Sequence, residues 1–431
     1  MGRWTEMSGI PKGYKKTDVG EIPNDWKAKE LKSIGIFSKG RGISRSEVKE
    51  QGKPCLRYGE IYTIYDTVIY ALKSFISDES VSTSKRLYPG DIIFAASGET
   101  SSEIAKNVTY LGEEEAYVGG DTIILTPKSQ DSVFLSYLLN SYPIAKQKSK
   151  IGQGDAVVHI HISKLDKIII CIPSLTEQQT IAQVLSDMDA LIQAQKELIA
   201  KKRDIKQGTM QELLSGRVRL PGYETKGWKH TDIGDIPDDW VVRELGDICE
   251  KIIGGGTPSR NNKIYWNGKI PWATVKDLSS FNFNSTQEYI TEEGLRESSS
   301  TLIPAGTIIL ATRMLIGKPV IYNCSVAINQ DLKALFLIKD YDKYYLLYYL
   351  NMKSNELIAA SSGSTVLGLS IQDLKTINLI SPSLLSEQQA IARVLSDMDD
   401  ELETLEAELE KLNHMKRGMM QELLTGRIRL I

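Results

Sequence analysis

The sequence predicts an α/β (α+β) fold in which two similar domains are joined by two long antiparallel coiled-coil helices, as an internal tandem repeat with pseudo-two-fold symmetry. Two repeated segments carry this prediction. Residues 17–31 recur as residues 231–245, with 9 of 15 positions identical at a shift of 214. Residues 177–220 align without gaps to residues 387–430, with 23 of 44 positions identical at a shift of 210. The intervening residues have diverged, so the repeat predicts one shared frame that carries two different middle parts.

The second repeated segment predicts a long helix in each copy, over about residues 177–214 and 387–424. Apolar residues in these segments step mostly by alternating fours and threes, which is the spacing of a coiled-coil seam. Ser386 is the expected N-cap of the second helix, and Gly216 and Gly426 are the expected C-terminal stops. The predicted seams contain Ile181, Leu185, Met188, Ile192, Ile199, Ile205 and Leu213 in the first helix and Ile391, Leu395, Met398, Leu402, Leu405, Leu409, Leu412, Met415, Met419 and Leu423 in the second.

The two predicted helices are expected to pair with each other. Gln195, Lys202 and Thr209 interrupt the first seam, which is a common device for fixing the register of a coiled coil. Residues 399–410 of the second helix hold seven carboxylates, whereas residues 201–206 of the first helix are basic. An antiparallel arrangement is expected because a whole domain lies between the two helices.

The diverged middles alternate short strand-like runs with turns rich in Gly and Ser, and each middle predicts an α/β body. The runs lie at residues 92–95, 122–125 and 167–172 in the first copy and at 307–311, 333–337 and 376–380 in the second. One helix is expected in each copy, near residues 132–147 and 343–359.

Composition places the chain among ordinary globular proteins, with 41% apolar and 25% charged residues. Its uncharged apolar runs are far shorter than the ~20 residues of a membrane-spanning helix. The N-terminal segment is charged and lacks an apolar core, so no secretory signal is expected. The four cysteines are scattered without CxxC spacing, which argues against a zinc knuckle and a disulfide framework. A cytoplasmic protein is expected.

Motifs for catalysis or for cofactors are absent from the sequence. It contains no GxxxxGK[ST] loop for ATP, no NPPY-like tetrapeptide of a base-amine methyltransferase and no Rossmann-type glycine turn. His159 and His161 lack a nearby third ligand, which favours a satisfied pair over a metal site. The aspartate pairs Asp187/Asp189 and Asp397/Asp399 recur inside the helical frame and are expected at an interface or on an exposed helix face. We therefore expect a non-catalytic chain with no cofactor and no metal.

Three motifs that each occur twice carry a family resemblance. They are TDxGxIPxDW near the start of each half, EQQxIAxVLSDMD opening each long helix and MQELLxGRxRL closing it. All three are similar to motifs of the specificity (S) subunits of type I restriction-modification systems. Residues 254–272, which include GGGTPS and YWNGKIPW, resemble the opening of a target recognition domain of that family. The resemblance covers residues 14–431.

The resemblance implies a DNA sequence-specificity subunit. Two target recognition domains, residues 1–172 (TRD1) and 221–381 (TRD2), would each read one half of a bipartite asymmetric DNA site. Two helical conserved regions, residues 173–220 and 382–431, would set the half-site separation and dock two methyltransferase (M) subunits, to which restriction (R) subunits add. The implied complex has DNA adenine methyltransferase and ATP-dependent endonuclease activities, neither of them carried by this chain.

Loops of both middles carry the donors that reading double-stranded DNA requires. Arg bonds guanine bidentately, Asn and Gln can do so with adenine, and glycine lets backbone N–H groups approach phosphate. In the first copy SKGRGISR, residues 38–45, stands where the second copy has GGTPS. The candidate DNA-binding residues are Lys39, Arg41, Arg45, Arg57, Lys85, Arg86 and Gln153 in the first copy and Thr257, Ser259, Arg260, Asn261, Lys263, Lys276, Arg313 and Ser364 in the second.

The charge balance argues against tight DNA binding by this chain alone. It carries 52 Lys and Arg against 55 Asp and Glu, and the first 220 residues are net positive (30 against 27) while the rest are net negative (22 against 28). Affinity for duplex DNA comes largely from phosphate neutralisation. High affinity is therefore expected only when methyltransferase subunits close around the duplex.

Two other classes of function stay open at this point. The chain could be the separate specificity chain of a fused nuclease–methyltransferase system, which its partner genes would reveal. It could instead be a coiled-coil adaptor with two protein-binding heads, in which case the host genome would carry no methylated bipartite motif.

Overall fold

The computed structural model describes residues 12–17, 19–154, 157–224, 227–279, 281–360 and 368–430. The chain divides into two compact units, one of residues 1–196 with 407–431 and one of residues 197–406. Each unit contains one α/β body together with a segment of each long helix. In the described ranges, no helix is long and apolar enough to cross a membrane.

The body of the first unit contains two sheets. The five-stranded sheet has the order β4-β13-β9-β11-β6, and the four-stranded sheet has the order β7-β5-β12-β8. The strands of the larger sheet are β4 (Gly35–Lys39), β13 (Thr122–Pro127), β9 (Ile92–Ala95), β11 (Asn107–Tyr110) and β6 (Val68–Ile69), and those of the smaller are β7 (Ser74–Ile76), β5 (Lys53–Leu56), β12 (Ala116–Val118) and β8 (Lys85–Leu87). All four residues of β9 are buried, which explains why this strand is an unbroken apolar run.

Smaller elements complete the first body. Three two-stranded pairs are β1 (Tyr14–Thr17) with β2 (Gly20–Pro23), β3 (Lys27–Glu30) with β15 (Ile169–Ile172), and β10 (Ser97–Gly98) with β14 (Val158–His159). The short helices are η1 (Leu31–Ser33), η2 (Arg45–Glu47), α1 (Tyr58–Thr63), α2 (Asp78–Val81) and α5 (Ile162–Leu165).

The body of the second unit repeats this strand order although its sequence has diverged. Its sheets run β19-β26-β23-β24 and β21-β20-β25-β22, which match the first four strands of the larger sheet and all four of the smaller sheet in the first body. The strands are β19 (Cys249–Gly254), β26 (Leu332–Leu337), β23 (Ile308–Ala311), β24 (Pro319–Ile321), β21 (Glu288–Ile290), β20 (Trp266–Ala273), β25 (Val326–Ile328) and β22 (Thr301–Ile303), with the pairs β16 (Trp228–Thr231) and β17 (Gly234–Pro237), and β18 (Trp240–Glu244) and β27 (Asn378–Pro382). The short helices are η3 (Lys263–Tyr265), α7 (Val275–Ser279), α8 (Glu292–Arg296) and α11 (Ile371–Lys375). The duplication therefore extends to the topology of the diverged middles.

The prediction of one helix in each middle was wrong, because each is two helices. The first copy has α3 (Ser132–Asn140) and α4 (Tyr142–Ile151), and the second has α9 (Lys343–Met352) and α10 (Ser354–Ala360). Ser141 between α3 and α4 is extended, with φ −68° and ψ 153°, and Pro143 follows in the first turn of α4. Proline lacks the N–H that a continuous helix would need at this point.

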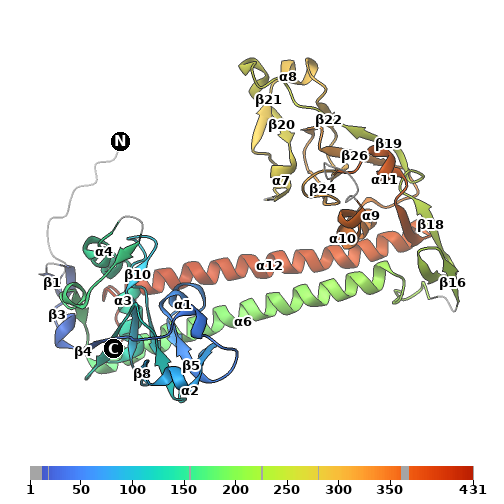
Figure 1. Cartoon of the computed structure of the whole chain (residues 1–431). Coiled ribbons are helices and arrows are strands. Elements are labelled where there is room, and N and C mark those ends of the chain that lie inside the picture. Colours follow the sequence, from blue (N-terminus) through green and yellow to red (C-terminus); the bar gives the residue numbers. More distant parts are fainter. Residues whose placement is uncertain are drawn as a thin grey trace. The chain divides into compact units, whose positions relative to one another are not determined.

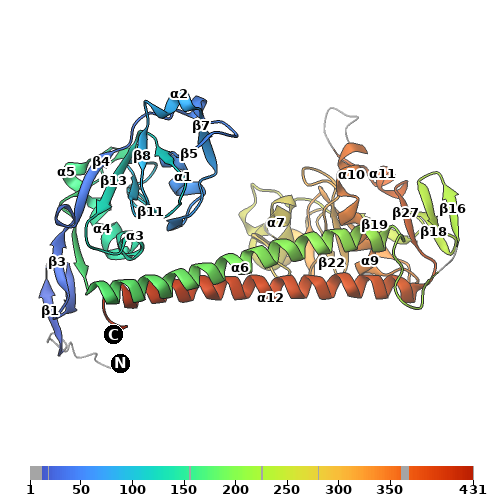
Figure 2. The ribbon, with the colours of Figure 1, turned by 90° about the horizontal axis from the view of Figure 1, so that it is seen from below.

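The long helices α6 (Leu175–Leu214) and α12 (Leu385–Leu423) pair in both units. Figures 1 and 2 show the two helices side by side. In the first unit Gln195 Nε2 lies 3.3 Å from Glu408 Oε2, and Asp189 pairs with Lys416. The pairs run in opposite chain directions, which confirms the antiparallel prediction.

Most residues of the predicted seam are buried or half-buried, but at one point in each helix the seam position lies one residue later than predicted. Ile205 and Met415, assigned to the seams, are 44% and 47% exposed. The half-buried positions that continue the three–four spacing are instead Lys206 and Lys416. The methylene groups of a lysine can pack in a seam while its ammonium group pairs with a carboxylate at the edge, here Asp399 for Lys206 and Asp189 for Lys416.

The predicted helix ends are partly confirmed. Gly216 and Gly426 have positive φ values of 74° and 73° just after the helices end, as the C-terminal stops require. The prediction of Ser386 as N-cap was wrong, because α12 already begins at Leu385.

Candidate nucleic-acid interface

Three of the candidate residues lie at the end of β4 and just after it: Lys39 is the last residue of β4, Arg41 lies in the loop that follows, and Arg45 begins η2. Arg41 is held by backbone carbonyls, because its Nε donates to Thr83 O at 2.9 Å and one terminal nitrogen donates to Ser82 O at 3.2 Å. Lys39 and Arg45 are exposed, and the described part of the chain offers neither side chain a hydrogen-bond or ion-pair partner. Arg41 thus shapes the loop, whereas Lys39 and Arg45 are available to a ligand.

Arg57 is tied to a buried carboxylate. Its guanidinium lies 3.4 Å from Glu60 Oε1, and its backbone N–H donates to Glu60 Oε2 at 2.8 Å at the start of α1. Glu60 is 4% exposed, so Arg57 neutralises a charge that would otherwise be costly to bury. This pairing indicates a structural role for Arg57.

The remaining candidates of the first body lie on a strand and on an exposed turn. Arg86 of β8 pairs with Glu115 at 3.2 Å and lies over the ring of Tyr88. Lys85, its neighbour on the same edge strand, is exposed. Gln153 is also exposed, and its backbone pairs with His159.

In the second body, Arg260 is held more firmly than any other candidate. Its two terminal nitrogens bond both oxygens of Glu288, and its guanidinium lies 3.7 Å from the centre of the Trp266 ring. Trp266 in turn packs edge to face on the buried Trp272, with the ring centres 5.1 Å apart. The hydrogen bond from Arg260 lowers the pKa of the Glu288 carboxyl, so the pair stays ionised. The loop with GGTPS is therefore braced against the YWNGKIPW strand.

Other candidates of the second body divide into paired and free side chains. Thr257 Oγ1 donates to Gln330 Oε1 at 2.7 Å, Ser259 O accepts from the Trp266 indole N–H at 3.1 Å, and Arg313 lies 3.6 Å from Asp331. The side chains of Asn261, Lys263 and Lys276 are exposed and make no hydrogen bond or ion pair within the described ranges. Ser364 lies outside the described residues.

The acidic partners of the arginines are what sequence reasoning missed. Glu60 had a local signal, since it stands three residues after Arg57 as in a capping box. Glu115 and Glu288 lie 29 and 28 residues from the arginines they pair with, and no periodicity in the sequence points to them.

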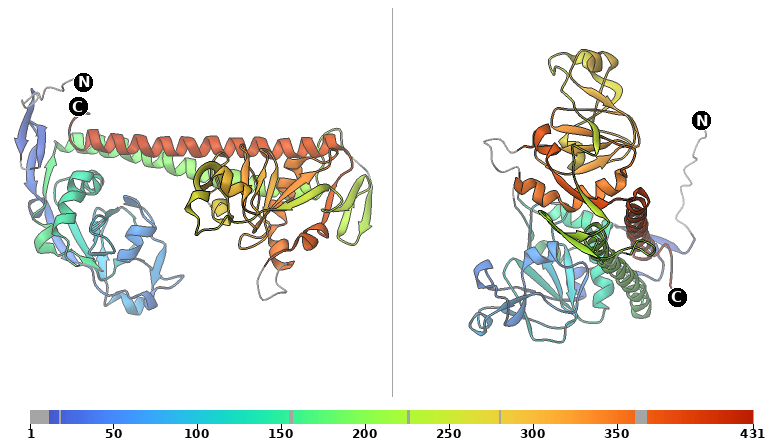
Figure 3. Two further views of the ribbon diagram at one scale, coloured as in Figure 1. Left: turned by 90° about the horizontal axis from the view of Figure 1, so that it is seen from above. Right: turned by 90° about the vertical axis from the view of Figure 1, so that its right-hand side faces the viewer.

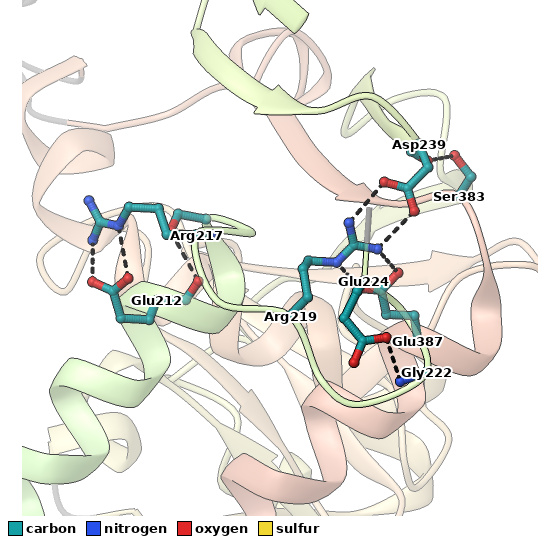
Figure 4. Close-up of polar contacts among 9 residues, drawn as sticks. Glu212, Arg217, Arg219, Gly222, Glu224, Asp239, Ser383 and Glu387 are labelled. Carbon is teal, nitrogen blue, oxygen red and sulfur yellow. Dashed lines mark hydrogen bonds and ion pairs between the residues drawn. The ribbon is translucent and has the colours of Figure 1, made fainter. Parts of the chain in front are cut away.

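The repeated motifs meet in one latch per unit, a charge cluster at the start of a long helix (Figure 4). In the second unit Arg219 bonds both oxygens of Glu387 at 2.7 and 2.9 Å and both oxygens of Asp239 at 2.9 and 2.8 Å. Its guanidinium lies 5.5 Å from the ring centre of Trp240, which is fully buried. Its complete burial makes Trp240 a packing residue of the second unit's core.

The first unit contains the equivalent latch at the C-terminal end of the chain. Arg429 bonds both oxygens of Glu177 and of Asp25 at 2.6 to 3.0 Å, and it lies over the buried Trp26. Tyr14 Oη donates to Gly426 O at 2.8 Å. Figure 3 shows strand β1 beside the C-terminal end of α12 in this unit. The short motifs at the two ends of each repeat are thus brought together in space.

His159 and His161, expected as a satisfied pair on one face, are both exposed, and the residue between them, Ile160, is buried. His159 Nδ1 lies 2.9 Å from Ser97 Oγ, whereas His161 precedes α5 as its N-cap residue. Across the described ranges, no group of three His, Cys, Asp or Glu side chains is placed to hold a metal ion.

These features define a duplicated scaffold, in which two α/β bodies of one topology carry different exposed loops on a shared antiparallel helix pair. The chain belongs to the type I restriction-modification specificity family, because the family model described as "Type I restriction modification DNA specificity domain" matches residues 23–201 and 237–414. The prediction of this family from the repeated motifs is confirmed.

Individual relatives agree with this family. The chain is 30% identical over 427 residues to a protein of Methanocaldococcus jannaschii named a putative type I restriction enzyme MjaX specificity subunit, covering 97% of both chains. A crystal structure of a type I restriction-modification system S subunit from M. genitalium has a TM-score of 0.57 at 14% identity and covers 92% of this chain and 96% of that one. A second structure, from work on assembly and conformational transition of a type I system, has a TM-score of 0.58 at 18% identity and covers 94% and 99%. At these identities the structures show the likeness of fold.

Proposed function

We propose that this chain is the DNA specificity subunit of a type I restriction-modification complex and has no catalytic activity of its own. Residues 1–172 would form TRD1 and residues 221–381 TRD2, and each would read one half of a bipartite site. Residues 173–220 and 382–431 would form the helical spacer, which docks two methyltransferase subunits, with restriction subunits added to the complex. The assembly would act in the cytoplasm, where the DNA is.

One observation carries this proposal. The two bodies share one strand order although their sequences have diverged, while the latches at their ends keep the same residues. Selection that retains a scaffold and its junctions but changes its loops is what two readers of different sequences require.

The exposed cations supply the DNA contacts in this proposal. Lys39, Arg45 and Lys85 of the first body and Lys263 and Lys276 of the second are free to neutralise phosphates. Asn261 and Gln153 are exposed amides that could bond adenine. Arg41, Arg86, Arg260 and Arg313 are already paired, so each would contact a base only by exchanging its partner or through its remaining donors.

Mapping of genomic methylation tests the proposal directly. In a host that carries the chain with its methyltransferase subunits, we expect methylated adenines in one bipartite motif, and we expect them to disappear when the gene for this chain is deleted. Restoring the gene is the control. A methylome that is the same with and without the gene would contradict the proposed function and favour the adaptor.

Two equivalent exposed apolar residues support docking of two methyltransferase subunits. Ile205 of α6 and Met415 of α12 are related by the shift of 210, and both lie outside the buried seam at 44% and 47% exposure. An equivalent apolar position in each unit fits two copies of one partner, because equivalent surfaces bind identical chains.

We expect each of the substitutions Ile205→Glu and Met415→Glu to abolish binding of one methyltransferase subunit to the complex. Burial of an isoleucine side chain is worth about 1.5–3 kcal/mol, so Ile205→Glu should weaken one docking site by at least about tenfold. We expect native mass spectrometry to give one bound subunit for Ile205→Glu or Met415→Glu and none for the double variant. Ile36→Glu, at an exposed position on β4, is the control and should retain two. Two bound subunits in all variants would place the docking surface elsewhere.

A further inference from the structure

Each α/β body is fastened to the long helices at a junction of a tyrosine, an aspartate and a lysine. In the first unit Tyr137 of α3 donates its hydroxyl hydrogen to Asp189 Oδ2 of α6 at 2.7 Å. The same carboxylate pairs through its other oxygen with Lys416 of α12. The Lys416 ammonium lies 5.8 Å from the centre of the Tyr137 ring. One carboxylate therefore joins the body to both helices.

The second unit repeats this junction with the roles of the two helices exchanged. Tyr348 of α9 donates to Asp399 Oδ2 of α12 at 2.7 Å, and Asp399 pairs with Lys206 of α6. The Lys206 ammonium lies 5.4 Å from the centre of the Tyr348 ring. The aspartates and the lysines of the two junctions are each related by the shift of 210. The duplication has thus kept this junction while the surrounding bodies diverged.

Both tyrosines are buried and act as hydrogen-bond donors. Tyr137 is 1% exposed and Tyr348 is 7% exposed. Desolvation by burial raises the pKa of both phenols, and the neighbouring aspartate raises it further, so the hydroxyl groups stay protonated. A hydrogen bond from a buried hydroxyl to a carboxylate is directional, unlike the apolar packing around it.

A second bond fastens the same body helix to the same long helix. Gln178 Oε1 accepts from the backbone N–H of Asp131, the N-cap of α3, at 3.1 Å. In the second unit Gln388 Oε1 accepts from the N–H of Asp342, the N-cap of α9, at 2.9 Å. Along the long helix, Gln178 and Asp189 are separated by about 16 Å at 1.5 Å per residue. Two directional bonds at this separation fix the angle of the body helix on the long helix, whereas with only one of them the angle would depend on the apolar packing between the two helices.

We propose that Tyr137 and Tyr348 are positioning residues that fix the orientation of each recognition domain on the helix pair and thereby restrict the length of the non-specific spacer between the two half-sites. This inference rests on the proposed DNA specificity function. The aspartate of each junction also holds a seam lysine of the opposite helix, so the same group ties the orientation of the body to the register of the pair. Loss of the hydroxyl leaves the aspartate paired with lysine, which keeps the helices together while the body can pivot.

The test uses the full complex with its methyltransferase subunits. Tyr137→Phe, Tyr348→Phe and the double variant are compared with wild type on plasmids that carry both half-sites at the native spacer and at spacers one base pair shorter and longer. We expect the double variant to raise methylation of the off-length sites, relative to the native site, by about tenfold, as loss of a hydrogen bond to a charged group predicts. The half-site sequences should not change. Tyr142→Phe and Tyr344→Phe, at exposed tyrosines, are matched controls and should keep the wild-type profile.

Each outcome decides the proposal. An unchanged spacer profile in the double variant overturns it, and so does a changed half-site sequence, because that would make the tyrosines part of the reading surface. Lys416→Arg, which keeps a cation beside Asp189, should retain the native spacer. If thermal unfolding shows that the double variant is misfolded, the spacer profiles of Tyr137→Phe and Tyr348→Phe alone test the proposal. Absence of any bipartite methylation with the wild-type chain would instead refute the proposed function.

Discussion

Arg219→Ala is expected to lower the free energy of unfolding by about 3–5 kcal/mol. Arg219 is the partner of Glu387, whose side chain is 1% exposed, and of Asp239. Removing the guanidinium leaves the Glu387 carboxylate buried without a counter-charge, and it also uncovers the face of Trp240. Chemical denaturation of the variant against wild type measures the loss.

A neighbouring arginine provides a matched control. Arg217 pairs with Glu212 at 2.9 Å, but its side chain is 57% exposed, so Arg217→Ala should cost about 1 kcal/mol or less. Arg219→Lys should lie between the two, because lysine cannot bond two carboxylates in the same forked manner. If Arg219→Ala and Arg217→Ala had the same free energy of unfolding, the buried ion pair of Arg219 would not stabilise the fold more than the exposed pair of Arg217 does.

The latch also predicts a dependence on acid. The hydrogen bond that Asp239 accepts from Arg219 lowers the pKa of the Asp239 carboxyl below its usual value of 3.8. A carboxyl whose pKa is lower in the folded state contributes stability that is fully present above its unfolded value and is lost as pH falls through its folded value. Wild type should therefore lose this contribution below about pH 3.8, and Arg219→Ala should show less of that acid dependence.

Lengthening both long helices by one heptad is expected to lengthen the DNA spacer and leave both half-sites unchanged. Seven residues inserted after Ala200 in α6 and seven after Glu403 in α12 keep the three–four spacing of the seam. They extend the helix pair by about 10 Å, which corresponds to about three base pairs of DNA. Methylation mapping of a host that carries the variant gives the new spacer directly.

The control is an insertion in one helix alone. Seven residues in α6 only would leave about two unmatched turns beside α12 and move pairs such as Lys202 with Glu401 out of register. Methylation should then be largely lost. A heptad insertion in both helices that changed a half-site and kept the spacer would reverse the assignment of reading and spacing to the bodies and the helices.

The frame was predictable from sequence because coiled-coil spacing is a local pattern and because the repeated segments align with each other without gaps. The seam from Ile391 to Leu402 and the stops at Gly216 and Gly426 follow from such patterns, and the structure has them. The slip of the seam to Lys206 was not predictable from apolar residues alone, because its stem packs while its charge reaches Asp399 of the opposite helix.

The candidate interface was less predictable for a physical reason. The sequence of a loop that contains Gly and Arg does not reveal whether the arginine is exposed without a partner or paired with a distant carboxylate. Arg260 and Arg45 both stand in such loops, but only Arg260 has a carboxylate across the sheet, at Glu288. Pairing between distant residues depends on tertiary structure, which no short pattern of the sequence encodes.

The latch of the first unit has a consequence for synthesis of the chain. Arg429, Leu423 and Leu424 complete the first unit, where the two leucines belong to its buried core. The ribosome makes these residues more than 200 positions after the rest of that core, a delay of roughly 12–48 s at 5–20 residues per second. During translation the body of the first unit must therefore wait with an apolar flank uncovered until residues 423–429 have been made and folded against it.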